Sequence, residues 1–541
     1  MNTVTATREG FSIGRRPVPW VLLLSAGAIA AIIAGPMVFL IGRALAGGGG
    51  TLAVLFSPRT AGLLFSTLVL AAAASVTSAA LGAGLAFLVE RTDLPGRRFW
   101  RVALALPLAI PPYIGAIAYL HLLSRGGVLD RAVGIAVPPY GLPGAVFIVA
   151  LFTYPYGFLL TSAALRRISR SLDEAARTSG LSSLRIFWTL TLPMIRPAIG
   201  ACIFFPSLYA LADFGTMVLL RYDTLATELY YQLTAMYDRS AAAALGVAAL
   251  LLAVGFLWFE ARLRGRGRHY QTDASWKPQA PLRLGPRRLP AAAAATAVAF
   301  LALALPAGLL GIWAYGGAAS PSGAARAWAV SAASPWSAAA GSLVLGMFAA
   351  TVIITLAAPP AYLRSRFPGG LAWAVWATAQ AGYALPGIVV VLGVAFLTNT
   401  MAPWLYGTLP VMVGAFMVRY MSQGLRAVES GLSQLPPRLG EAARGLGERP
   451  SGVFRRVDLP LLRPSLIAGW AMVFLNVLKD LPVNLLLRPA GFDTLPVRTW
   501  LSATDGIYTQ AALPALLLIA CAAVPLVVLL HYTAARGLDV T

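Results

Sequence analysis

Long apolar runs alternate with short polar or basic segments along the whole chain. A helix that spans the hydrocarbon core of a bilayer needs about 20 mostly apolar residues, and runs of this length recur from end to end. They predict an all-α membrane protein with about twelve spanning helices, whose boundaries are accurate to about three residues. The expected helices are 19–42, 62–89, 102–124, 143–165, 194–215 and 241–261 in the first half, and 291–315, 338–363, 371–397, 405–425, 464–482 and 511–535 in the second.

Composition and charge support this interpretation and orient the chain. The sequence is 58% hydrophobic and only 11% charged, about half the charged fraction of a soluble protein. Between the expected helices, about three quarters of the 42 Lys and Arg residues fall on the side of the N-terminus. The positive-inside rule therefore places both termini in the cytoplasm. The net charge of +22 suits anionic membrane lipid, and its distribution argues against a nucleic-acid partner.

A polar segment after the fourth expected helix is repeated, 267 residues later, after the tenth. The matching features are Glu174-Ala175-Ala176 with Glu441-Ala442-Ala443, Gly180 with Gly447, Leu192-Pro193 with Leu459-Pro460, Arg196-Pro197 with Arg463-Pro464, Asp213 with Asp480, and Arg221 with Arg488. Matches over such a length indicate an internal duplication. Six spans in each copy return the chain to its starting side, so the two halves are expected to be parallel, related by an axis along the membrane normal.

The repeated segment is expected to form a helix, a turn and a second helix at the membrane surface. Ser171 and Glu174 have the spacing of a capping box, and Gly180 is suited to end the helix in a left-handed conformation. In the second copy Arg438 replaces the capping Ser, yet Glu441 is present. If the two Glu residues served only as caps, Glu441 would be poorly explained. A docking role, with small Ala residues beside the acid, is therefore favoured.

This pattern resembles the cytoplasmic signature of permease subunits of bacterial ABC importers. The resemblance implies a type I ABC importer permease fold, an inner-membrane location, two copies of a separate ATPase subunit and a periplasmic binding protein as partners. The expected coupling loops are 166–193 and 426–460. The residues that would contact the ATPase are Glu174, Ala175, Ala176, Gly180, Glu441, Ala442, Ala443 and Gly447.

A second resemblance concerns the substrate. The segments Asp213-Phe214-Gly215, Lys479-Asp480-Leu481-Pro482 and Ile110-Pro111-Pro112-Tyr113 are similar to the ferric-iron branch of fused permeases. Related permeases of the same architecture carry thiamine, phosphonates, polyamines or sulfate, and these remain alternatives. Asp480 departs from the pattern, because many iron-type members have Glu at that position.

The residues expected to line a translocation path are Asp213, Asp480, Tyr113, Pro112 and Pro386. Prolines break helices, and a break at membrane depth is tolerated where protein or a water-filled cavity satisfies the freed carbonyls. Acidic residues in apolar spans usually face a cavity or a partner. Two structural alternatives stay open. The prolines would only kink helices for packing, and each Asp would pair with Arg221, Arg488 or Lys479.

The two halves are expected to comprise 1–262 and 290–541, joined by a basic cytoplasmic tether, 263–289. The chain lacks the phosphate-binding loop of ATPases, because Lys277 precedes Pro278 and Lys479 precedes Asp480. It is therefore expected to be a transport subunit and not an enzyme, with no cofactor. Neither His121, His269 and His531 nor Cys202 and Cys521 have metal-ligand spacing. A major-facilitator transporter is the more distant alternative, since loop 91–98 is similar to a loop of that class.

Overall fold

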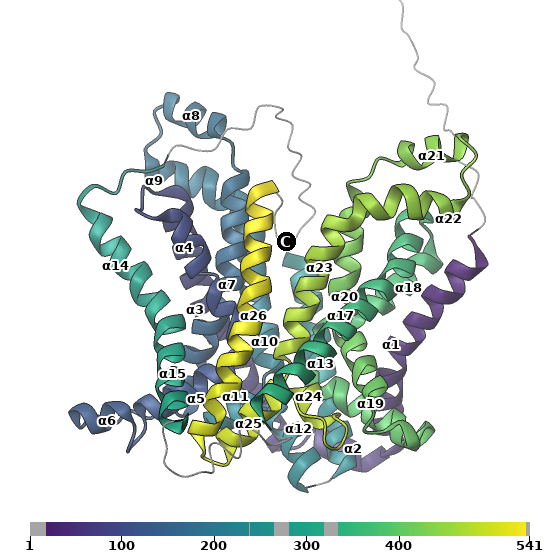
Figure 1. Cartoon of the computed structure of the whole chain (residues 1–541), viewed down its shortest axis with the longest axis horizontal. Coiled ribbons are helices and arrows are strands. Elements are labelled where there is room, and N and C mark those ends of the chain that lie inside the picture. Colours follow the sequence, from purple (N-terminus) through teal and green to yellow (C-terminus); the bar gives the residue numbers. More distant parts are fainter. Residues whose placement is uncertain (1–17, 237, 264–280, 319–333, 537–541) are drawn as a thin grey trace, which may run out of the picture.

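The computed structural model describes residues 18–236, 238–263, 281–318 and 334–536. This part of the chain is helical almost throughout, and one isolated β-bridge joins Thr92 to Leu282. The all-α architecture expected from the apolar runs is confirmed. Long helices form a bundle, and the short helices α8 (Arg170–Thr178) and α21 (Pro437–Gly445) project together from one end of it (Figure 1).

Helices appear at all of the predicted positions. The first half contains α1 (Trp20–Ala46), α2 (Gly48–Leu55), α3 (Pro58–Arg91), α4 (Arg97–Ala103), η1 (Leu106–Ala109), α5 (Pro112–Leu123), α6 (Val128–Val133), α7 (Gly141–Arg167), α8, α9 (Ser183–Ile186), η2 (Phe187–Thr191), α10 (Leu192–Ala212), α11 (Gly215–Leu219), α12 (Leu225–Tyr231), η3 (Gln232–Met236) and α13 (Arg239–Leu263).

The second half contains η4 (Gly285–Arg287), α14 (Arg288–Ala299), η5 (Phe300–Ala304), α15 (Leu305–Ala318), α17 (Pro335–Arg366), α18 (Gly370–Gln380), η6 (Ala381–Ala384), α19 (Gly387–Met401), η7 (Pro403–Leu405), α20 (Leu409–Ser433), α21, α22 (Pro450–Val453), η8 (Phe454–Asp458), α23 (Leu459–Lys479), α24 (Pro482–Leu486), α25 (Leu495–Thr504) and α26 (Tyr508–Arg536). The helices from α8 to α11 reappear as α21 to α24 with every boundary shifted by 267 residues, so the duplication seen in the sequence extends to the structure.

Not every predicted span meets a strict test of length and apolarity. Among the described residues, nine helices are long and apolar enough to cross a membrane, or ten if a pair bent by 90° at Ile110–Pro111 counts as one. The expected third span is this bent pair. The expected ninth span is divided between α18 and α19, and the expected tenth, α20, carries Arg419, Arg426 and Glu429. The spans that fail the test are broken or charged, which is typical of helices that line a polar interior.

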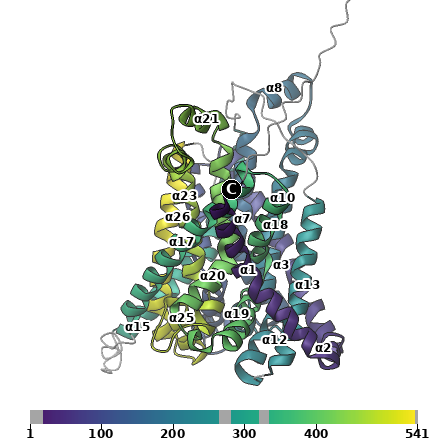
Figure 2. The same ribbon diagram turned by 90° about the vertical axis from the view of Figure 1, so that its right-hand side faces the viewer.

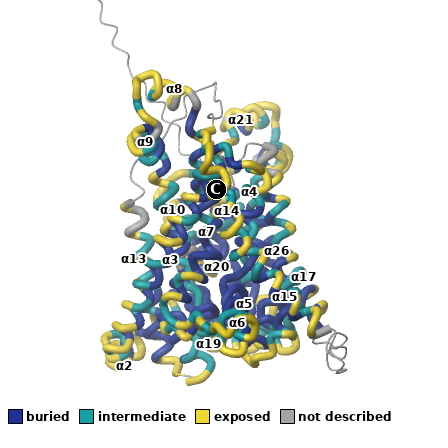
Figure 3. The backbone as a smooth tube through the Cα atoms, turned by 90° about the vertical axis from the view of Figure 1, so that its left-hand side faces the viewer, coloured by how far each residue is buried: buried dark blue, intermediate teal, exposed yellow. Residues whose placement is uncertain are grey.

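Each half is built around a triplet of mutually packed helices: α3, α7 and α10 in the first, and α17, α20 and α23 in the second. Close approach is possible because small residues lie at the contacts, as is common between membrane helices. A Cβ at Gly82 of α3 would lie only 2.6 Å from the carbonyl oxygen of Tyr154 in α7. Burial is concentrated in the middle of this bundle and exposure at its ends (Figure 3).

Helices near the ends of each half pack on the opposite half. Helix α1 contacts α17, α18 and α19, and in the reverse direction α15 contacts α5 and α26 contacts η1. Figure 2 shows α1 descending beside α18, α19 and α20. The halves therefore share an extensive interface that does not depend on the covalent connection between them.

The last part of the expected tether is an ordered contact and not a loose connection. Leu282 forms backbone hydrogen bonds with Arg91 (2.7 Å) and Asp93 (3.0 Å), and the Asp93 carboxylate accepts from the Leu284 amide at 2.9 Å. Arg288 pairs with the same carboxylate and holds the pKa of Asp93 below its usual range. Loop 91–98, which suggested a major-facilitator motif, thus anchors the start of the second half. Residues 264–280 of the predicted tether lie outside the described residues.

We expect the two halves to assemble without the covalent link, provided the ordered contact is left intact. Co-expression of 1–270 with 271–541 should yield a complex that co-purifies through a tag on one half. The reason is that α1, α15 and α26 each pack on the opposite half.

A cut that separates 281–288 from the second half, for example between Arg288 and Leu289, is the matched comparison. It should lower the yield of the complex, since the contact to Asp93 would no longer position α14. Equal yields from both cuts would show that this contact contributes nothing to assembly.

Candidate functional site: the coupling loops and the central cavity

The helices α8 and α21 end in the same hydrogen-bonded turn. Gly180 has φ +78° and Gly447 has φ +88°, a left-handed conformation that favours glycine. The amide of Gly180 donates to the carbonyl of Arg177 at 2.9 Å, and the amide of Leu181 donates to Ala176 at 3.2 Å. The same two bonds recur in the second copy, so the predicted glycine turn is confirmed in both.

The starts of these helices differ from the prediction. Helix α8 begins at Arg170 with Ser169 as its N-cap residue, and α21 begins at Pro437 after Pro436. Ser171 is therefore inside the helix, and the predicted capping box is wrong. Proline at the first helical position explains the second start, because its missing N–H is not needed there. Both Glu174 and Glu441 are the fifth residue of their helix, outside the capping position.

The repeated acidic and small residues form an exposed face. Glu174 and Ala175 are exposed and Ala176 is half-buried, and the same order holds for Glu441, Ala442 and Ala443. Both helices lie at the end of the bundle where α1 starts and α26 finishes (Figure 1). Two equivalent surfaces are therefore presented in the same direction.

Between the halves lies a cavity of about 140 Å³. Most of its polar lining comes from the ends of α10 and α23 and from the middle of α7 and α20. The lining residues are Leu108, Ile110, Pro111, Pro112, Tyr113, Phe152, Thr153, Tyr156, Tyr209, Ala212, Asp213, Phe214, Gly215, Arg419, Tyr420, Asn476, Lys479, Asp480, Leu481 and Pro482. The neighbouring helices α11 and α24 lie toward the end of the bundle opposite α8 and α21 (Figure 1).

Pro112 begins α5 and breaks the third span of the first half beside this cavity. In an unbroken helix the carbonyl of Leu108 would accept from the amide of residue 112, which proline lacks. The ammonium group of Lys479, at the end of α23 in the other half, donates to that carbonyl at 2.8 Å. The break in the third span therefore supplies an acceptor, and the second half supplies its donor.

Asp480 is fully buried and is paired with a residue that the sequence analysis gave no role. The Nε of Arg419 lies 2.9 Å from its Oδ2, and the hydroxyl of Tyr420 donates to the same oxygen at 2.6 Å. The other oxygen accepts from the Val483 amide at 2.9 Å. An Arg within a predicted span was the available signal, because a charge at membrane depth needs a partner.

Asp213 occupies the equivalent position of the first half but has neutral partners. Its Oδ1 accepts from the amide of Thr216 at 3.1 Å, as Asp480 does from Val483, and its Oδ2 accepts from the Thr216 hydroxyl. The residue that corresponds to Arg419 is Phe152, 267 positions earlier. The two carboxylates thus share a backbone role while their electrostatic surroundings differ.

The counter-ions suggested from sequence are engaged elsewhere. Arg488 pairs with Asp493, and the guanidinium of Arg221 lies over the ring of Tyr140, 4.7 Å from its centroid. Lys479 contacts a carbonyl and not the adjacent Asp480. The proposed pairing of either Asp with Arg221, Arg488 or Lys479 is therefore wrong for this structure.

Pro386 is the N-cap residue of α19 and lies just outside the residues that line the cavity. Its neighbour Gly387 contacts one of those lining residues. A Cβ at Gly387 would lie 1.5 Å from Nη1 of Arg419. The break at Pro386 therefore brings a residue without a side chain against the guanidinium. Tyr113 lines the cavity directly, and its buried hydroxyl has no hydrogen-bond partner among the described residues.

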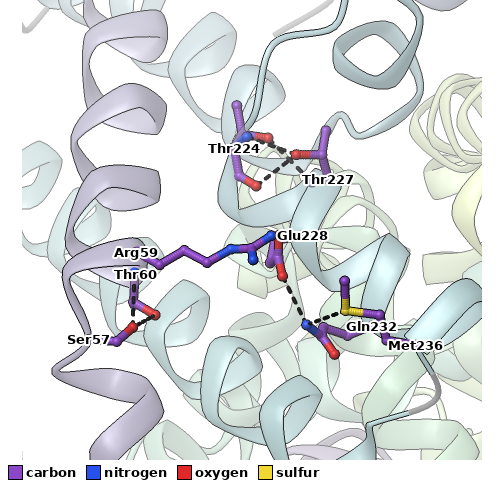
Figure 4. Close-up of polar contacts among 8 residues, drawn as sticks. All are labelled: Ser57, Arg59, Thr60, Thr224, Thr227, Glu228, Gln232 and Met236. Carbon is purple, nitrogen blue, oxygen red and sulfur yellow. Dashed lines mark hydrogen bonds and ion pairs between the residues drawn. The ribbon is translucent and has the colours of Figure 1, made fainter.

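At the end of the bundle opposite the coupling loops, Arg59 of α3 reaches Glu228 of α12 (Figure 4). The ion pair measures 2.8 Å, with the Arg side chain 68% exposed and the Glu 7%. Gln232 donates to the other carboxylate oxygen at 2.9 Å, and Thr224 and Thr227 cap the start of α12 reciprocally. In the second half Arg488 and Arg498 both contact Asp493. This end of the protein therefore carries an exposed basic group at Arg59 and half-buried ones at Arg488 and Arg498, each paired with an acid.

The described residues contain no group of three or more His, Cys, Asp or Glu side chains arranged to hold a metal ion. His121 packs against Trp313, with 4.5 Å between ring centroids. Cys202 is a buried free thiol and Cys521 is half-buried and free. Both are consistent with packing roles.

Comparison with known proteins identifies relatives over nearly the whole chain. Residues 78–268 and 342–536 each match the family described as "Binding-protein-dependent transport system inner membrane component". The Fe(3+)-transport system permease protein FbpB 2 of Haemophilus influenzae is 28% identical over 96% of this chain and 99% of its own length. The molybdenum transport system permease protein ModB of Escherichia coli is 30% identical over 30% of this chain and 73% of its own.

A solved structure, that of a bacterial ABC transporter involved in the import of the acidic polysaccharide alginate, aligns with a TM-score of 0.37 and 20% identity. The alignment covers 41% of this chain and 87% of that one.

We expect Gly387→Ala to destabilise the cavity wall by about 1–3 kcal/mol, as overpacking typically does. The added methyl group would displace Arg419 from Asp480 and leave a buried charge without its partner. Thermal unfolding of the purified protein in detergent measures this effect.

Gly414→Ala, on α20, is the matched control, because a Cβ there meets nothing within 4 Å. It should leave the unfolding temperature unchanged or slightly higher. Equal stability of the two variants would contradict the close contact between Gly387 and Arg419.

Proposed function

This chain belongs to the family of binding-protein-dependent transport system inner membrane components, and on that premise we propose that it is the permease of an ATP-driven importer. The observation that carries the proposal is the repeated coupling surface on α8 and α21, one in each matched segment. Each surface would bind one copy of a separate ATPase subunit. The major-facilitator alternative is wrong, because both matched segments belong to a different family.

The proposed orientation places α8 and α21 in the cytoplasm of a bacterial inner membrane. The basic residues that accompany both coupling loops support it, since they suit the cytoplasmic leaflet. A periplasmic binding protein would then dock at the opposite end, near the basic groups Arg59, Arg488 and Arg498. In this arrangement both termini would lie on the cytoplasmic side.

We propose ferric iron as the cargo. The relative that covers nearly the whole chain is named as an Fe(3+)-transport permease, and the cavity presents carboxylate and phenol oxygens from Asp213, Tyr113 and Tyr209. Hard cations favour such oxygen ligands. Thiamine, polyamines and phosphonates remain the alternatives.

The transport cycle follows from the positions of these parts. ATP binding would draw the two ATPase subunits together and carry α8 and α21 with them. Each coupling helix leads through α9 or α22 into a long helix, α10 or α23, that ends at the cavity. A change in the spacing of the coupling helices would therefore reach Asp213 and Lys479 directly and open the cavity toward the binding protein.

The direct test is uptake into lipid vesicles that contain the permease with its ATPase, with the binding protein outside. Ferric iron should accumulate when ATP is present, and thiamine and a polyamine should not. Accumulation of thiamine or the polyamine instead of iron would refute the proposed cargo while leaving the importer class intact.

We expect reversal of both coupling charges, Glu174→Lys with Glu441→Lys, to abolish co-purification of the ATPase. Losing a charged contact across an interface costs about 2–5 kcal/mol, and two equivalent sites would lose it together. The variant should still insert in the membrane, because both side chains are exposed.

Asp505→Lys is the control for charge reversal, since Asp505 is exposed and follows α25 at the opposite end of the bundle. Gly447→Val should also weaken ATPase binding, because φ +88° strains any residue with a Cβ. Gly445→Val, two residues earlier and without a positive φ, should have a smaller effect. Normal ATPase recovery with the double Glu variant would refute the docking role.

The two repeat-related carboxylates should respond differently to removal of their charge. Asp480→Asn leaves Arg419 buried without its counter-ion, which typically costs about 3–5 kcal/mol, so the unfolding temperature should fall. Asp213→Asn keeps an acceptor for Thr216 and should preserve stability while reducing uptake. Thermal unfolding and vesicle uptake, measured on both variants, separate the two roles. Normal uptake by a stable Asp213→Asn protein would exclude Asp213 from the path.

A further inference from the structure

The two halves line the cavity with equivalent helices but with different side chains. Five pairs of positions related by 267 residues line it: Phe152 and Arg419, Thr153 and Tyr420, Tyr209 and Asn476, Ala212 and Lys479, and Asp213 and Asp480. The first half contributes aromatic rings and one carboxylate. The second half contributes both of the cations and the other carboxylate.

Only part of this charge is neutralised within the protein. Arg419 and Asp480 form an ion pair at 2.9 Å. Lys479 donates to the neutral carbonyl of Leu108, and Asp213 accepts from the amide and hydroxyl of Thr216. Within the described ranges, neither Lys479 nor Asp213 has an oppositely charged side chain at ion-pair distance. Lys479 and Asp213 therefore line the cavity without an ion-pair partner, and the charge of Arg419 acts on Asp213 only from beyond ion-pair distance.

These groups specify the chemistry of what can be bound. Lys479 retains hydrogen-bond donors beyond the one given to Leu108, and the buried hydroxyl of Tyr113 has no partner among the described residues. They require an acceptor, and the positive charge of Lys479 makes an anionic oxygen the best one. Asp213 requires a positive centre. A bare trivalent cation would satisfy Asp213 but would be repelled by Lys479 and Arg419, strongly so in a medium of low dielectric constant.

We propose that the cargo crosses this cavity as a ferric ion that still carries an anionic oxygen ligand, with Asp213 facing the metal and Lys479 facing the ligand. The inference rests on the proposed function and adds the form in which the ion passes. Carboxylate and phosphate are the two classes of ligand with this chemistry. The anion therefore enters the cell together with the iron.

The test is double-label uptake into vesicles containing the permease, its ATPase and the binding protein. Radioactive ferric iron is supplied with labelled citrate in one arm and with labelled phosphate in the other. In at least one arm the anion should accumulate in a constant ratio to iron and only when ATP is present. Iron uptake without either anion would overturn the inference and leave ferric import intact.

Substitution of the cation gives an independent result. Lys479→Met should lower uptake of iron and anion together by about tenfold or more, as loss of a buried charged contact typically does, and Lys479→Arg should restore most of it. Lys277→Met, at the chain's other lysine, is the control and should behave as the unmodified protein.

A binding measurement separates this role from a structural one. Purified permease in detergent, equilibrated with labelled iron and citrate or phosphate, should retain both labels. Lys479→Met should retain neither label, and Lys479→Arg, which keeps a charged donor for the Leu108 carbonyl, should retain both. Full retention by a folded Lys479→Met protein would overturn the inference. Absence of iron uptake by the unmodified protein, with thiamine or a polyamine imported instead, would overturn the proposed function and this inference together.

Discussion

The bond between the Lys479 ammonium and the Leu108 carbonyl is the contact on which the central cavity depends. Hydrocarbon offers no water to satisfy a freed backbone group, so a helix can be broken at membrane depth only where another part of the protein supplies the missing partner. Pro112 frees the carbonyl, and Lys479 reaches it from the other half at 2.8 Å. The break that makes room for a polar cavity is thereby stabilised across the interface between the halves.

The repeated parts of the chain have diverged to different extents, and their partners explain why. The coupling helices agree in length, in exposure and in the left-handed glycine that ends them, as the proposed binding of two copies of one subunit requires. The proposed cargo would contact both walls of the cavity at once, so nothing requires the two walls to be alike. Phe152 corresponds to Arg419 and Ala212 to Lys479 in the repeat, so a common backbone carries different side chains at the cavity.

Local features of the fold could be predicted from the sequence, and contacts between distant residues could not. The spanning helices, the duplication and the turns at Gly180 and Gly447 depend on nearby residues or on periodicity, and they were predicted correctly. The start of α8 was misplaced because Ser169 and Ser171 are both plausible caps within two positions. The pairing of Arg419 with Asp480, the docking of Leu282 beside Asp93 and the bond from Lys479 to Leu108 join residues 61 to 371 positions apart, beyond the reach of any sequence pattern.

The arrangement of α23 connects the two functional regions through one rigid element. It begins directly after η8, which is part of the second coupling loop, and it ends at Lys479. Its 21 residues span about 30 Å at 1.5 Å per residue. Helix α10 does the same in the first half but ends at Ala212, beside Asp213, without a cation. A displacement of α23 relative to the first half must therefore change the distance from Lys479 to Leu108, whereas the same displacement of α10 breaks no equivalent bond. The two surfaces on α8 and α21 are alike, but only the second leads into a helix that ends at a lysine bonded to the broken third span, within the described part of the chain.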